Sequence, residues 1–178
     1  MARPVPERID PWLLSEQEAV LEGRFDLSAL PRLAPLLRDT AGEVRYRFRF
    51  GRDDHGRSLI HTTVEAVLDL ECQRCLESMA HQVHAVGTLA LVRGPMEAEQ
   101  LPRALDPLLL DEQERVTVMR LVEDELLLSL PVVPRHASDQ CPGHRAEPES
   151  SDLPEASERE NPFAVLAGLK KKSGGNPN

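Results

Sequence analysis

The chain has 178 residues, 40% of them hydrophobic, which is enough for one folded domain with its own core. Aromatic residues make up only 3% of it, so broad stacking surfaces for single-stranded nucleic acid are not expected. A formal net charge of -9 argues against a protein that coats nucleic acid by neutralising phosphates, although a local basic patch is compatible with it.

Neither a secretory signal nor a membrane span is predicted. Residues 1–14 lack a basic stretch followed by a long apolar run. The most apolar stretch, residues 126–133, is interrupted by Ser129 and Pro131, and it falls short of the roughly 20 residues that a span requires. We therefore expect a cytoplasmic protein.

The first predicted element is a short strand at residues 20–27, with apolar side chains at Leu21, Phe25 and Leu27. Ser28 can then cap a helix. The apolar positions of this helix are Leu30, Leu33, Leu36 and Leu37. Pro35 predicts a kink, so the helix should be short or irregular.

Residues 44–50 carry the clearest strand pattern, because an arginine alternates with an apolar residue at every step. A turn composition follows at residues 51–56, and residues 59–70 resume an extended pattern rich in Thr and Val. A further strand is predicted at residues 81–92. Together these segments predict a sheet of several antiparallel strands.

Residues 94–113 contain three prolines among acidic residues, which predicts an irregular surface loop. Thr117 can cap a helix over residues 119–130, which Pro131 ends and which should pack on the sheet. The expected fold class is therefore α+β, an antiparallel β-sheet with packed helices. The consecutive acids Glu123, Asp124 and Glu125 splay around the helix, which favours a solvated face.

The end of the chain differs in composition. Residues 145–160 are acidic, polar and proline-containing, so they cannot bury enough apolar surface to offset the entropy of ordering. We expect an α+β domain at 1–144, a disordered acidic linker at 145–160, and a C-terminal docking motif with a basic tail at 161–178.

Three cysteines suggest a metal site. Cys72 and Cys75 form a C-x2-C pair, and Cys141 with His144 forms a C-x2-H pair. Two-residue gaps let both side chains of each pair point at one tetrahedral ion, so a structural zinc site with these four ligands is reasonable. His136 is the alternative fourth ligand.

Two other interpretations of the cysteines stay open. Cys72 and Cys75 can be an ordinary pair at a turn, with Cys141 unpaired on a loop. They can also form a redox dithiol, although such chemistry requires the pair to open a helix after a parallel strand. No phosphate-binding loop and no convincing set of nucleophile, base and orienting residue is present, so nothing identifies an enzyme.

Three segments in order resemble landmarks of the YceD family. They are VLDLECQRCLE at residues 67–77, LVEDELLLSLPVVPRH at 121–136 with Cys141 shortly after, and NPFAVLAGLKKK at 161–172. The resemblance implies a role in the synthesis or accumulation of 23S ribosomal RNA. In that family some members look as if they carry a cysteine at the place of His144, which gives two C-x2-C pairs, whereas others keep only the first three cysteines.

Two contact surfaces follow as hypotheses. The first is a nucleic-acid-binding stripe formed by Arg45, Arg47, Arg49, Arg52 and Arg57. Alternate residues on one strand face lie about 6.6 Å apart, comparable to successive phosphates of ribosomal RNA or an assembly intermediate. The alternative is a solvated outer sheet face.

The second hypothesis is a docking motif that recruits a ribosomal protein or another partner. Its residues are Asn161, Pro162, Phe163, Val165, Leu166, Leu169, Lys170 and Lys171. They combine a compact apolar surface with a basic end. The alternative is a tail that docks onto its own domain.

Overall fold

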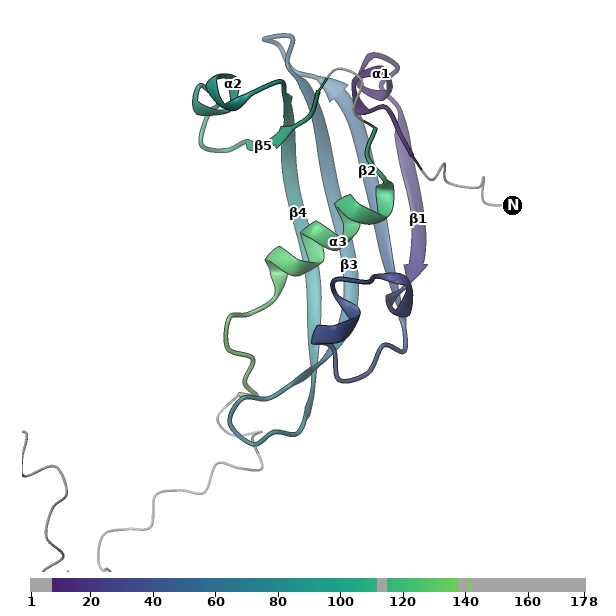
Figure 1. Cartoon of the computed structure of the whole chain (residues 1–178), viewed down its shortest axis with the longest axis vertical. Helices are drawn as coiled ribbons and strands as arrows, with labels where there is room; N and C mark the ends of the chain where they lie inside the picture. The colour runs from purple at the N-terminus through teal and green to yellow at the C-terminus, as the bar shows by residue number, and fades with distance from the viewer. Residues whose placement is uncertain (1–7, 112–114, 138–140, 142–178) are drawn as a thin grey trace, which may run out of the picture. The chain divides into compact units, whose positions relative to one another are not determined.

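The computed structural model describes residues 8–111, 115–137 and 141, and a five-stranded sheet forms its frame (Figure 1). The strands are β1 (Val20–Asp26), β2 (Glu43–Arg52), β3 (Ser58–Glu71), β4 (Ser78–Val92) and β5 (Asp106–Leu109). Their order across the sheet follows the chain, with antiparallel pairing from β1 to β4 and β5 parallel to β4. The predicted antiparallel sheet is confirmed, with one parallel pair added at its edge.

The alternation in β2 sorts its side chains between the two faces of the sheet. Tyr46 and Phe48 are buried, whereas Arg45, Arg47 and Arg49 are exposed. Cross-strand partners share a face, so Phe48 lies beside Thr62 of β3 on the buried side. The sheet therefore has one apolar face and one open, charged face.

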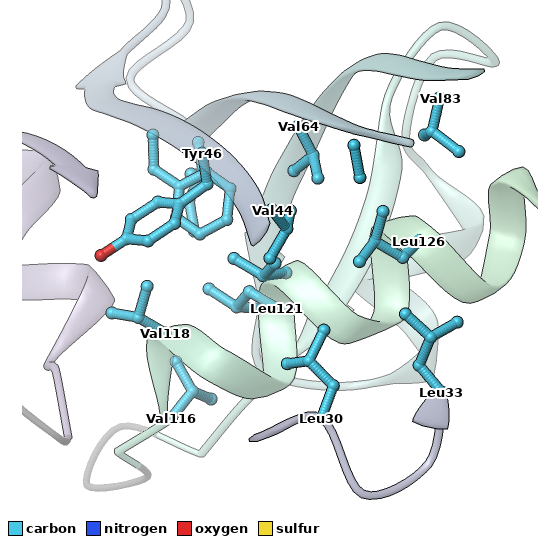
Figure 2. Close-up of a cluster of buried hydrophobic side chains, with 14 of the residues drawn as sticks. Leu30, Leu33, Val44, Tyr46, Val64, Val83, Val116, Val118, Leu121 and Leu126 are labelled. Carbon is cyan, nitrogen blue, oxygen red and sulfur yellow. The ribbon is translucent and has the colours of Figure 1, made fainter. Parts of the chain in front are cut away.

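Helix α3 (Val118–Ser129) covers the apolar face. The Thr117 side chain accepts a hydrogen bond from the backbone N–H of Arg120, which confirms the predicted cap. Figure 2 shows Leu121 and Leu126 of α3 directed toward the sheet, and both are almost fully buried. Burying a leucine side chain contributes about 1.5–3 kcal/mol, so this contact is a main source of stability.

The segment between β1 and β2 differs from the prediction. It contains two short 3-10 turns, η1 (Leu27–Ala29) and η2 (Ala34–Leu36), in place of a helix, and Ser28 lies inside η1. Pro31 and Pro35 lack the N–H donors that a helix requires, which explains the break. Leu30 and Leu33 are nevertheless fully buried, so the segment is held by packing.

Two further short elements depart from the prediction. The stretch predicted as an irregular loop contains α2 (Pro95–Glu99) and β5, which pairs with the end of β4. An unpredicted helix, α1 (Pro11–Glu16), begins at Pro11 and is capped by the Asp10 side chain. Both helices are too short for hydrophobic periodicity to reveal them.

The chain separates into two units, Met1–His144 and Arg145–Asn178. The second unit, with the predicted linker and docking motif, lies outside the described residues, so those predictions stay predictions. Among the residues that the structure describes, no helix is long and apolar enough to cross a membrane.

The acidic residues of α3 are not the solvated face that was predicted. Glu123 is only 3% exposed, and its Oε1 accepts the backbone N–H groups of Arg32 at 2.6 Å and Leu33 at 3.0 Å. Asp124 forms ion pairs with the Arg32 and Arg120 side chains. Glu123 therefore ties the turn segment to the helix by satisfying two amides that have no strand or helix partner.

We expect Glu123→Ala to lower the free energy of unfolding by about 2–4 kcal/mol, because it leaves two backbone donors near the core without an acceptor. Asp124→Ala, which removes two largely exposed ion pairs, should cost about 1 kcal/mol or less. Urea unfolding of both variants and the parent measures the difference. Equal losses for the two variants would contradict this role of Glu123.

Candidate metal centre

The hairpin between β3 and β4 ends in a tight turn that carries Cys72 and Cys75. The Cys72 N–H donates to the Glu77 carbonyl at 2.9 Å, and the Leu76 N–H donates to the Cys72 carbonyl at 2.8 Å. Leu76 adopts a φ of 63°, a left-handed conformation that a leucine seldom takes. This turn brings the two sulfur atoms to the same side of the hairpin tip.

The segment after α3 completes the cluster. Hydrogen bonding of the Gln73 N–H to the Pro134 carbonyl at 2.8 Å fixes this segment to the hairpin tip. Ligand atoms of Cys72, Cys75, His136 and Cys141 then all lie within 4.8 Å of one another. This cluster can hold a metal ion.

His136 is oriented by its second ring nitrogen. Its Nε2 lies 3.0 Å from the carbonyl oxygen of Ser78, the first residue of β4, and a carbonyl only accepts hydrogen bonds. The proton therefore resides on Nε2. Nδ1, 3.5 Å from the Cys75 sulfur, keeps its lone pair for a metal ion.

The surroundings of Cys72 favour its thiolate form. Burial opposes ionisation, but backbone N–H groups of Cys75, His136 and Arg74 directed at the sulfur lower the pKa of Cys72 to about 5. A hydrogen bond with the Cys72 sulfur in turn raises the pKa of His136, so a metal ion that binds Nδ1 competes with a proton there. Thiolates are the form of cysteine that binds metals, so Cys72 is prepared for coordination at neutral pH.

Arg74 lies between Cys72 and Cys75 in the sequence and contacts the other two members of the cluster. Its Nε donates to the Cys141 sulfur at 3.1 Å, and its guanidinium reaches the His136 carbonyl at 3.2 Å. The positive charge lies beside sulfur atoms that become negative on metal binding. Neither Arg74 nor Ser78 was predicted as part of the site, because no local pattern marks such supporting residues.

Four protein ligands bound to one ion would complete a tetrahedral shell and would leave no open position for a substrate. The three cysteines form no disulfide. The C-x2-C pair joins two antiparallel strands and does not open a helix, so backbone N–H groups of the turn, and not a helix dipole, lower the pKa of Cys72. The four groups could therefore hold a metal ion.

The structure brings together the three predicted cysteines and places His136, the alternative histidine, beside them. His144, the fourth ligand first favoured, lies outside the described residues. The residues of the predicted docking motif, 161–171, also lie outside them. For these positions the sequence-based predictions stay predictions.

Arg45, Arg47 and Arg49 lie on the open face of β2. Arg52 ends β2 with the parity of the buried Phe48 and Phe50, and Arg57 lies in the turn that follows. Acids accompany most of these arginines. The ion pairs are Arg45–Glu43 at 3.6 Å, Arg47–Glu22 at 3.8 Å, Arg52–Glu16 at 2.9 Å and Arg57–Asp53 at 2.6 Å. Arg49 forms no ion pair among the described residues. The positive charge of this face is thus largely compensated.

Comparison with known proteins identifies the family to which the chain belongs. The family model described as "Large ribosomal RNA subunit accumulation protein YceD" matches residues 60–170. The protein of that name from Haemophilus influenzae is 31% identical over 169 residues, which cover 94% of this chain and 97% of the relative. No solved structure matches the chain significantly. By the family model and by this full-length similarity, the chain belongs to the YceD family.

Proposed function

We propose that this protein is a non-enzymatic, cytoplasmic factor of ribosome biogenesis that supports synthesis, processing or accumulation of 23S ribosomal RNA. The observation that carries this proposal is the similarity to the Haemophilus influenzae relative, which extends over nearly the whole of both chains. A metal ion held by all four ligands would agree with it, because such a centre stabilises a fold and offers no open position for a reaction. The contact is made with RNA or with a large-subunit protein.

Zinc is the proposed ion. Three thiolates and one imidazole suit Zn²⁺, and the proposed ligands are Cys72, Cys75, Cys141 and the Nδ1 of His136. When bound, the ion contributes folding free energy by joining the hairpin tip to the segment after α3. His144 is the competing fourth ligand, so the two histidines need separate tests.

We expect the purified protein to bind one Zn²⁺ or Co²⁺ per chain. Co²⁺ should give thiolate-to-metal charge-transfer absorption together with the intense visible bands of a tetrahedral site. His136→Gln should weaken metal affinity about 10–100-fold or more, because it removes a ligand. His144→Gln should leave both affinity and spectrum unchanged.

The reverse result, with loss in His144→Gln and none in His136→Gln, would assign the fourth ligand to His144. A protein that binds neither ion would contradict a metal centre altogether. Thermal unfolding with and without a chelator supplies an independent reading, since a structural ion raises the unfolding temperature.

For an RNA contact, the open face of β2 is the best described candidate. Arg45, Arg47 and Arg49 are all exposed there. The ion pairs that accompany two of them are exposed, so exchanging a carboxylate for a phosphate costs about 1 kcal/mol or less for each. The second proposed contact, through residues 161–171, rests on the sequence alone.

In a bacterium that lacks its own YceD protein, we expect this chain to restore the ratio of 23S to 16S ribosomal RNA. Failure to do so, with the chain present at normal abundance, would contradict the proposed function. If RNA is the partner, reversing Arg45, Arg47 and Arg49 to Glu should weaken RNA crosslinking and reduce the salt slope of binding by about 2.

The matched control reverses three exposed arginines that lie outside the strands of the sheet, Arg8, Arg103 and Arg115. It changes net charge equally, so a general electrostatic effect lowers binding in both variants. Loss confined to the β2 variant supports the stripe. Unchanged RNA binding in the β2 variant directs the search toward a protein partner.

A further inference from the structure

The outer edge of β4 is largely unpaired within the described part of the chain. β5 pairs only with Leu89–Val92, whereas β4 begins at Ser78, so residues 78–88 have strand neighbours on one side alone. Figure 1 shows β5 beside one end of β4 only. At about 3.4 Å per residue, the free edge is roughly 35 Å long.

This free edge carries none of the usual protection against pairing with another chain. Residues 78–88 include no proline and no Asp, Glu, Lys or Arg. The opposite edge strand, β1, carries Glu22, Arg24 and Asp26, all exposed. Sheet edges that stay unpaired are normally protected by charge, proline or a bulge, so β4 differs from β1 in the manner expected of a pairing site.

Apolar side chains are available beside the free edge. Val86 is 69% exposed on the open face of β4. The ring of His81 lies 3.4 Å from the Ser129 carbonyl, which places the last turn of α3 next to this strand. Leu128 in that turn is 85% exposed. An added strand could cover such side chains on both faces.

Carboxylates mark one end of the free edge. Glu125 accepts a hydrogen bond from the Thr62 hydroxyl at 2.9 Å, and its carboxylate lies within 4 Å of the space beside Gly87 of β4. Asp106 stands opposite Leu89, where the pairing with β5 begins. Neither acid forms an ion pair with a basic side chain among the described residues.

Burial raises the pKa of Glu125, and the charge of Asp106 raises it further. A cation at this position would therefore relieve an unfavourable pair of acids. No basic side chain of the described residues fills this role, so a binding partner could supply the cation.

We infer that the free edge of β4, Ser78 to Thr88, adds an extended strand from a basic partner protein, with a Lys or Arg of that strand placed against Glu125 and Asp106. Backbone hydrogen bonds supply the affinity in this mode, and the cation sets the register. A second copy of this chain is disfavoured by its own net charge of -9. RNA is disfavoured because the same carboxylates repel phosphates.

The probe is a labelled ten-residue peptide in which Lys alternates with Val and Thr, added to the full-length protein and followed by fluorescence anisotropy. We expect saturable binding, together with slower hydrogen exchange of the amides at residues 79–88. A peptide with Glu in place of every Lys should not bind. A Lys peptide with N-methyl groups at alternate residues should bind at least about ten-fold more weakly, because it cannot complete the ladder.

Protein variants test the position of the cation. Glu125→Gln combined with Asp106→Asn should weaken the Lys peptide about five-fold. Glu22→Gln combined with Asp26→Asn on the β1 edge is the matched control and should leave the affinity unchanged. Unfolding curves establish that each variant is folded before its affinity is compared.

Several results would overturn the inference. These are absence of binding, equal binding of the N-methylated peptide, equal binding of the acidic peptide, and amides at 79–88 that are already protected in the free protein. The inference would also be overturned if self-association or RNA binding slowed exchange of these amides and the Lys peptide did not slow it. The inference goes beyond the proposed function and does not depend on it, since the peptide assay involves no ribosomal RNA measurement.

Discussion

The packing of α3 across the apolar face of the sheet is the contact on which the other features depend. Leu121, Val122 and Leu126 of this helix are buried against the strands. Glu123 of the same helix binds the segment after β1. The chain that follows the helix runs to the hairpin tip and carries His136 there. Loss of this packing would therefore separate the candidate metal ligands as well as open the core.

The hairpin tip needs a support of its own. Cys72 and Cys141 are buried, yet neither belongs to the apolar cluster formed by the sheet and α3. A turn of six residues beyond the end of β3 cannot bury enough apolar surface to order itself. The four ligands and Arg74 take the place of a second core there, and a metal ion would join segments more than 60 residues apart in sequence.

The features that could be predicted from sequence are those that neighbouring residues determine. Alternation of arginine with apolar residues predicts β2, and the hydroxyl of Thr117 predicts the start of α3. The two-residue gap between Cys72 and Cys75 predicts the turn that joins β3 to β4. The role of Glu123 could not be predicted, because its partners, Arg32 and Leu33, are some 90 residues away. For the same reason, spacing alone could offer His136 only as an alternative to His144, since His136 meets the cysteines through the path of the chain after Pro131.

The charges of the open face limit the electrostatic attraction between this protein and RNA. Acids of β1 and β2 stand beside the arginines of β2, and the chain as a whole is negative, so long-range attraction to RNA is weak. Exposed ion pairs are nevertheless worth only about 0–1 kcal/mol each, so phosphates delivered by another contact can displace the acids. Hence a protein contact that forms first, with the arginines engaging RNA afterwards, fits this charge distribution better than direct capture of RNA from solution.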